Sequence, residues 1–192
     1  GALDDSPAGE NNLYTMSQKP IYQKLPLIRS LAYSPNGRNL AQNGYHEVLI
    51  ADTSSGKVVA RLIGLSERIE SVAFSPNGKW LAVAGGKPGK MGEIQIWDWE
   101  KEKLLLSHSV TYDTLYGVSW SPDGNFVAFG ASDTAVRVIN AKSGEAVVYM
   151  AGHDDWVRGT VFSDDGKSVF SVSRDKTVKQ TDLETERFIG NV

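Results

Sequence analysis

Cysteine is absent from the 192 residues of this chain, which excludes disulfides, thiolate metal sites and covalently attached c-type haem within it. There is no secretory signal, and no apolar run approaches the roughly 18 residues that a membrane helix needs. Only three histidines are present, too few to indicate a zinc site. The chain has a net charge of −3, whereas general nucleic-acid binders typically carry a basic patch. We therefore expect no cofactor, no metal, no nucleic acid and no membrane as partner.

A turn tetrapeptide recurs four times along the chain, at starts that are 41, 46 and 42 residues apart. The copies are Ser34-Pro35-Asn36-Gly37, Ser75-Pro76-Asn77-Gly78, Ser121-Pro122-Asp123-Gly124 and Ser163-Asp164-Asp165-Gly166. A period of roughly 40–45 residues is typical of four-stranded propeller blades. The repeat predicts four blades over about residues 27–64, 65–110, 111–152 and 153–192.

Residues 1–26 lack repeat character and predict an irregular N-terminal leader. The first residue is Gly1 and not methionine, so we expect a processed end, an expression scar or an excerpt from a longer chain.

Within each copy the pattern predicts four short antiparallel strands. In the third copy they fall at residues 115–120, 126–130, 135–139 and 145–149, because apolar and polar residues alternate there with the period of two that strands require. Asn-Gly and Asp-Gly pairs suit tight hairpins between them. No segment has helical periodicity, so the predicted fold class is all-β.

The third strands end in a recurring pair, which is Ala51-Asp52, Trp97-Asp98, Ile139-Asn140 and Thr181-Asp182 in the four copies. With Gly152-His153 and the run SRDKTV at residues 173–178, this makes the chain resemble the WD40-repeat family over about residues 27–190. The resemblance implies a β-propeller whose blades present loops to other proteins.

In the WD40 family a His, a Ser or Thr, an Asp and a Trp form a hydrogen-bonded network inside a blade. The resemblance assigns His153, Ser173 and Asp175 to this network in the fourth copy, where Thr181 replaces the Trp. The network positions kept in the other copies are Trp97, Asp98 and Asp133. No copy is complete, so we expect stability to depend more on apolar packing between blades.

The same residue types could suggest chemistry, and each case has a structural alternative. His153, Ser173 and Asp175 are the parts of a nucleophilic triad, but the WD40 match places the serine in an interior, away from an oxyanion pocket. We therefore predict no catalytic residue and no enzyme activity. The repeat also places Trp97 and Trp120 between sheets, where they would serve as core.

The second copy is longer because of a glycine- and lysine-rich loop at residues 85–92. Exposed backbone N–H groups there could cradle a phosphate, yet the pattern is not a P-loop and no helix follows it. A flexible hairpin or partner-contact loop is the preferred interpretation. Loops vary in length and carry function more often than the scaffold does.

In WD40 folds the loop between the second and third strands shares one rim with the loop between blades. Aromatic and arginine residues are enriched at interface hot spots. On position in the repeat, the predicted partner-binding residues of this rim are Tyr45, His46, Lys87, Lys90, Tyr112, Trp156 and Arg174.

Four blades raise the question of ring closure. Propellers span 4–8 blades, and WD40 rings usually have seven or eight, whereas the fourth copy here brings its own last strand at residues 186–189. An open arc would leave apolar faces exposed on its first and last blades. We expect either that the chain is part of a longer propeller or that it forms a homodimer with an eight-bladed ring, with a closed four-bladed form as the alternative.

A narrower similarity concerns bacterial WD40 proteins that accompany a c-type cytochrome domain. It rests on GYHEVL at residues 44–49, LSERIES at 65–71, VTYDT at 110–114 and TERFI at 185–189. It would imply a periplasmic location, and otherwise a cytoplasmic one is expected.

Three functions follow as hypotheses. The first is a non-catalytic scaffold that binds proteins or peptides through rim loops. The second is an accessory module of a cytochrome-linked redox protein. The third is a propeller enzyme with a central-channel site, which is disfavoured because no His, carboxylate or metal constellation converges.

Overall fold

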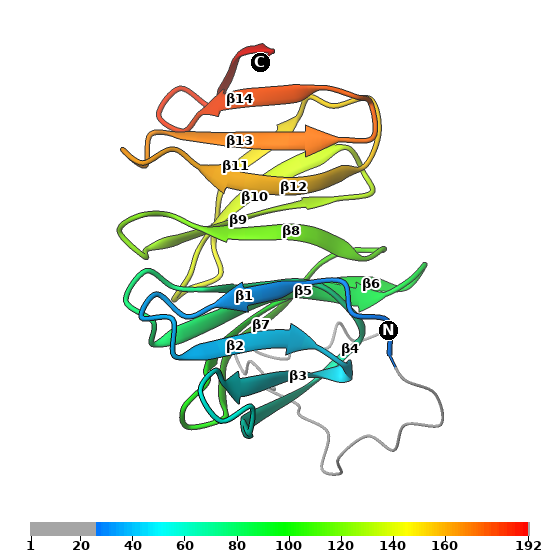
Figure 1. The fold of residues 1–192 in the computed structure, drawn as a ribbon. Helices are drawn as coiled ribbons and strands as arrows, with labels where there is room; N and C mark the ends of the chain where they lie inside the picture. Colours follow the sequence, from blue (N-terminus) through cyan, green and yellow to red (C-terminus); the bar gives the residue numbers. More distant parts are fainter. Residues whose placement is uncertain (1–25, 192) are drawn as a thin grey trace, which may run out of the picture.

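The structure, a computed structural model, describes residues 26–191, and this part of the chain consists of β-strands joined by turns and loops (Figure 1). The prediction of an all-β fold is confirmed. Because residues 26–191 hold no helix, none there is long and apolar enough to cross a membrane. The predicted leader over residues 1–26 lies, except for Pro26, outside the described residues.

Fifteen antiparallel strands make up four consecutive blades of the described chain, numbered here from the N-terminus. Blade 1 consists of β1 (Leu31–Tyr33), β2 (Asn39–Asn43), β3 (Tyr45–Asp52) and the first half of β4 (Val58–Phe74). Blade 2 consists of the second half of β4 with β5 (Trp80–Lys87), β6 (Met91–Asp98) and β7 (Lys103–Thr111). Blade 3 consists of β8 (Leu115–Trp120), β9 (Phe126–Ala131), β10 (Ala135–Asn140) and β11 (Ala146–Ala151). Blade 4 consists of β12 (Val157–Phe162), β13 (Ser168–Ser173), β14 (Val178–Asp182) and β15 (Arg187–Asn191).

One long strand joins the first two blades into a single seven-stranded sheet. The first part of β4, residues 58–63, pairs with β3, and residues 68–74 pair with β5. The predicted boundary between residues 64 and 65 therefore falls inside a continuous strand. Blades 3 and 4 are separate four-stranded sheets.

The repeated tetrapeptide closes the first hairpin of each blade. In the first copy Ser34 Oγ donates to Asn36 Oδ1 at 2.8 Å and accepts the Asn39 N–H at 2.9 Å, while Gly37 has a φ of 69°. The other three copies repeat both contacts, with a glycine φ between 70° and 72°. Glycine adopts this left-handed conformation at little cost, so the tetrapeptide forms the same turn in every blade.

Apolar side chains fill the seams between neighbouring blades in three clusters. Trp97 and Trp120 are both buried there, as their repeat positions predict. Hydroxyl groups also join the innermost strands of neighbouring blades. Ser30 Oγ accepts the Val72 N–H at 3.1 Å, and Ser71 Oγ accepts the Val118 N–H at 3.0 Å.

The blades stack as an open arc with blades 1 and 4 at opposite ends (Figure 1). On the outer face of blade 1, Leu31 and Tyr33 are 59% and 66% exposed. On the outer face of blade 4, Val161 is 57% and Val172 44% exposed. These two surfaces are called the end faces below.

Candidate functional site

The loops between second and third strands, with the connections between blades, lie at one end of the sheets, called the loop rim here. The predicted rim residues fall there into three groups, and they do not form one site. In the first, the rings of Tyr45 and His46 meet edge to face at 4.2 Å. Lys87 contributes from blade 2, where its Nζ lies 3.8 Å from Glu67. Burial lowers the pKa of His46, which favours a neutral ring.

The second group is Lys90 with Tyr112, which line a shallow depression of about 290 Å³. Tyr112 is 90% exposed. The loop that precedes Lys90 is a regular hairpin between β5 and β6, and the Gly89 N–H donates to Asp113 Oδ1 at 3.1 Å. The Gly89 N–H, which an anion-binding loop would offer to its ligand, is thus bonded to a carboxylate of the chain.

The third group consists of aromatic and arginine side chains that contact one another on the loop rim. The rings of Tyr116 and Trp156 stack at 5.9 Å with an interplanar angle of 18°. The Arg158 guanidinium lies 4.4 Å over the tyrosine ring, and that of Arg174 lies 5.0 Å over the indole. These four residues are called the rim cluster below. Cation–π contacts of this kind contribute roughly 0.5–1 kcal/mol each at exposed sites.

Tyr116 and Arg158 are not among the predicted rim residues, although the repeat contains a signal for both. Counting back five residues from each turn serine reaches Arg29, Glu70, Tyr116 and Arg158 in the four blades. Neighbours in this series contact one another, since Arg29 pairs with Glu70 at 3.4 Å as Arg158 does with Tyr116. Burial and the nearby carboxylate of Glu70 raise the pKa of Tyr116. Aligning the copies on the turn would have shown this chemically distinct position.

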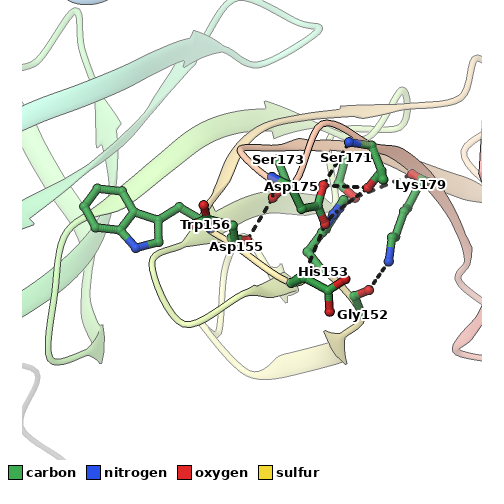
Figure 2. Close-up of polar contacts among 10 residues, drawn as sticks. Gly152, His153, Asp155, Trp156, Ser171, Ser173, Asp175 and Lys179 are labelled. Carbon is green, nitrogen blue, oxygen red and sulfur yellow. Dashed lines mark hydrogen bonds and ion pairs between the residues drawn. The ribbon is translucent and has the colours of Figure 1, made fainter.

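A buried network lies beside the loop that carries Trp156 (Figure 2). His153 Nδ1 lies 2.8 Å from Asp175 Oδ2, and its Nε2 lies 2.8 Å from Ser171 Oγ. The hydroxyl of Thr177 donates to Asp175 Oδ1 at 2.7 Å. The predicted network residue Ser173 accepts the Asp175 N–H at 3.1 Å, but the hydroxyl that contacts the imidazole Nε2 is that of Ser171. Ser171 lies deeper in β13 and is buried, whereas Ser173 ends the strand.

Ser173 instead takes part in holding the loops together. Its Oγ donates to the backbone oxygen of Asp155 at 2.9 Å, and the Arg174 N–H donates to the backbone oxygen of Trp156 at 3.0 Å. The Asp154 N–H adds a bond to Asp175 Oδ2 at 3.0 Å. These bonds tie the β11–β12 connection to the β13–β14 loop. Figure 2 shows the indole of Trp156 directed away from the network that supports its backbone.

The electrostatics of this network fit a positioning role. Burial by itself raises the pKa of Asp175, but hydrogen bonds from the Thr177 hydroxyl, the Asp154 N–H and His153 outweigh it, so the net shift is downward. The carboxylate therefore stays ionised at neutral pH. Two hydroxyls lie within hydrogen-bond distance of the imidazole: that of Ser171, which is buried, and that of Thr177, which lies 3.2 Å from Nδ1 and also donates to Asp175.

The remaining predicted network residues lie apart from any histidine. Asp98 pairs with Lys101 at 2.8 Å, and Asp133 accepts two bonds from the Arg137 guanidinium at 3.0 and 2.5 Å. Burial raises the pKa of Asp133, but the guanidinium outweighs this and lowers it overall. Trp97 Nε1 donates to Gln95 Oε1 at 2.8 Å. The family network is thus absent from blades 2 and 3, as their incomplete motifs indicated.

Blade 2 has a different buried network that the sequence analysis missed. Glu93, 2% exposed, accepts bonds from Ser66, from Gln95 at 2.8 Å and from Ser107 at 2.5 Å. Gln95 in turn accepts the Trp97 indole bond described above. Five residues before the end of the third strand, blades 1 and 2 carry Glu47 and Glu93, where blade 4 carries Thr177. The expectation that stability depends mainly on apolar packing is therefore incomplete.

Two family models match adjoining parts of the chain. The model described as "Eukaryotic translation initiation factor eIF2A" matches residues 3–143, and the model described as "WD domain, G-beta repeat" matches residues 144–182.

Similarity to individual proteins extends over much of the chain. A periodic tryptophan protein 2 homolog of Caenorhabditis elegans is 29% identical over 140 residues, which cover 73% of this chain and 15% of that protein. Periodic tryptophan protein 2 of Arabidopsis thaliana is 30% identical over 127 residues, which cover 66% and 14%. Nuclear distribution protein nudF of Emericella nidulans is 35% identical over 156 residues, which cover 71% and 35%. This chain thus spans only a minor part of the length of these relatives.

Proposed function

Because this chain belongs to the WD40-repeat family, and residues 3–143 to the family of the eIF2A model, we propose that it is a non-catalytic scaffold that binds proteins or peptides. The observation that carries the proposal is the rim cluster. It places the partly exposed indole of Trp156 and the exposed guanidinium groups of Arg158 and Arg174 on the loop rim, with the buried ring of Tyr116 in contact with Trp156 and Arg158. Trp, Tyr and Arg are the residues most enriched at interface hot spots.

The charges of the rim cluster also favour a binding role. Arg158 is exposed, and no carboxylate within residues 26–191 forms an ion pair with it. Arg174 lies only at the edge of pairing distance, with its Nε 3.6 Å from Asp155 Oδ2. Both can bond a partner without first breaking a strong internal pair. The loops that carry them are held by the His153 network, which reduces the entropy lost on binding.

The other predicted rim residues extend the proposed interface around the arc. Tyr45, His46 and Lys87 would form its contact surface on blades 1 and 2, and Lys90 with Tyr112 the surface near blade 3. Relatives carry names that refer to nuclear distribution or to periodic tryptophan. Since these differ, no single pathway or compartment is proposed.

The end faces support a further part of the proposal. Apolar patches of this kind are seldom left exposed, so we infer that they are covered by further blades of a longer chain or by a second copy in a homodimer. The small share of each relative that this chain spans favours further blades. The cytochrome-linked and enzymatic alternatives receive no support from the comparisons. Metal analysis and a hydrolase substrate screen test them, and turnover of any substrate would contradict the non-catalytic role.

Photocrosslinking tests the rim directly. A benzoylphenylalanine placed at position 112 or 156 should give discrete adducts with a partner in extracts of the source cells. The same residue at Val59, which is exposed on β4 away from the loop rim, is the matched control. Adducts at Val59 alone, or none at the rim, would contradict the proposal. The double variant W156A/R158A should keep the melting temperature within a few degrees and lose the adduct formed at position 112.

A further inference from the structure

A cavity of about 420 Å³ lies between blades 3 and 4, at the opposite end of the sheets from the loop rim. It opens beside two of the repeated turns, where Pro122 and Gly166 form part of its wall. Its size falls in the range of about 300–1,000 Å³ typical of ligand sites. This cavity, called the turn-edge cavity below, takes no part in the proposed rim interface.

The seam between blades 3 and 4 differs from the other seams in the side chains beside this cavity. Trp99 follows the third strand of blade 2, where its buried indole packs against Phe74 and donates to the Gly78 carbonyl at 2.8 Å. The equivalent residue of blade 4 is Leu183, which lines the cavity. Likewise Phe126 lines it at the position that Trp80 occupies in blade 2. The other two seams carry one indole each at these positions, Trp99 opposite Asn39 and Trp80 opposite Ala141, whereas this seam carries none.

The turn-edge cavity is lined partly by apolar and partly by charged side chains. Its apolar wall consists of Phe126, Val138, Val147 and Leu183. Its charged lining consists of the carboxylates Asp123, Asp165, Asp182 and Glu184 with the single ammonium group of Lys167. Four negative groups and one positive group give a formal charge of −3. A concave site with apolar walls and a net charge of one sign concentrates the electric field, and this field attracts ions of opposite charge.

Two of these carboxylates have an oxygen that the chain leaves available. Asp165 Oδ1 accepts the Ser163 hydroxyl at 2.6 Å and the Lys167 N–H at 3.0 Å. Asp182 Oδ1 accepts the N–H and the hydroxyl of Thr185, both at 2.7 Å. Within the described chain, neither Oδ2 receives a hydrogen bond. The bonds from Ser163 and Thr185 lower the pKa values of Asp165 and Asp182, so both stay charged at neutral pH.

We propose that the turn-edge cavity binds a basic segment of a partner protein, with one arginine or lysine side chain inserted. The alkyl stem would lie against Phe126, Val147 and Leu183, and the cationic head would meet Asp165 and Asp182 at the mouth. Long basic side chains bury their stems in apolar surface and keep their charge at its wet edge. Bonds between such a head and a carboxylate are stronger than bonds between neutral groups.

The repeats themselves supply substitutions that test the charge without disturbing the fold. The position of Asp165 is Asn36 in blade 1, where Asn36 Oδ1 takes the same bonds from Ser34 and the Arg38 N–H. The position of Asp182 is Asn140 in blade 3, whose Oδ1 accepts two backbone N–H groups. The double variant D165N/D182N should therefore keep both turns and remove two charges. The variant L183W should fill the cavity as Trp99 does in blade 2.

The experiment titrates the whole chain with the peptide Gly-Leu-Arg-Leu-Gly and follows the methyl NMR signals of Val147 and Leu183. We expect saturable shifts with a Kd of about 1 mM or tighter, binding weakened about tenfold in D165N/D182N, and no shift of Val147 in L183W. The same peptide with Gln in place of Arg should bind at least about tenfold more weakly. Equal binding of both peptides, or binding unaffected by either variant, would overturn the proposal. W156A, on the loop rim, should leave the titration unchanged.

Discussion

The imidazole of His153 lies 2.8 Å from the carboxylate of Asp175, and this contact joins the connection before β12 to the loop after β13. Both side chains are almost completely buried, with exposures of 1% and 5%. The contact therefore acts on the rim indirectly, because the two loops that it joins carry Trp156 and Arg174. A residue with the appearance of a catalytic base thus positions the two loops of the proposed rim interface.

Separate substitutions of the two serines distinguish the roles that the structure assigns to them. S171A should lower the free energy of unfolding by about 1–3 kcal/mol, because it leaves a buried ring nitrogen of His153 without a partner. S173A should cost about 1 kcal/mol or less, since the hydroxyl lies at the end of the strand, but it should loosen the loop that carries Arg174. Urea denaturation measures both values. A larger loss for S173A than for S171A would contradict the assignment of Ser171 as the buried partner of the histidine.

Lowering the pH should reduce the contribution of Asp175 to the free energy of unfolding. Because the pKa of Asp175 is lowered in the folded chain, its stabilisation is complete above the ordinary value of 3.8 and is lost as the pH falls below it. D175N should cost about 1–2 kcal/mol at pH 7, and the gap to the unsubstituted chain should narrow as the pH falls below 3.8. Urea midpoints from pH 7 down to pH 3 measure this gap. A gap that widens on acidification would contradict the assigned shift.

Glu93 should be among the most sensitive polar positions of blade 2. E93A leaves the hydroxyls of Ser66 and Ser107 and the amide of Gln95 without their shared acceptor, so we expect a loss of at least about 2 kcal/mol. E93Q keeps the volume and one acceptor oxygen and should cost less. A urea midpoint that is lower for E93A than for E93Q would support the network. Equal stability of E93A and the unsubstituted chain would show that these bonds contribute nothing.

The fold could be predicted from the sequence because turn chemistry and strand alternation are local signals. The strands predicted at residues 115–120 and 135–139 agree closely with β8 and β10. The choice between Ser171 and Ser173 could not be made in this way. Both lie on one face of β13 at a spacing of two, and only the depth of the strand in the sheet decides which reaches His153.

Other features depend on which copies become neighbours in space. Glu93 is an isolated carboxylate in the sequence, and its partners Ser66 and Ser107 lie on the two strands at either side of the blade. The rim cluster combines Tyr116 and Arg158 from neighbouring first strands, 42 residues apart in the chain. The turn-edge cavity lies at a seam where neither of two repeat positions carries the indole found at the other seams. Its existence requires the packed seam, which the sequence pattern does not describe.

The end faces lead to a prediction about association. If a second copy covers them, light scattering with chromatography should give about twice the chain mass of 20.9 kDa. L31K/V161K should then return the chain to the monomer, because each face would bury an ammonium group without a partner.

L105K adds the same charge at an exposed position on β7 of blade 2, away from both terminal blades, and should leave the mass unchanged. A monomer that binds a hydrophobic dye, and loses that binding in L31K/V161K, would assign the faces to further blades of a longer chain. A monomer that binds no dye and resists heat would contradict the open arc, because exposed apolar faces of this kind bind dye and destabilise the isolated chain. A closed four-bladed ring would then be the better description.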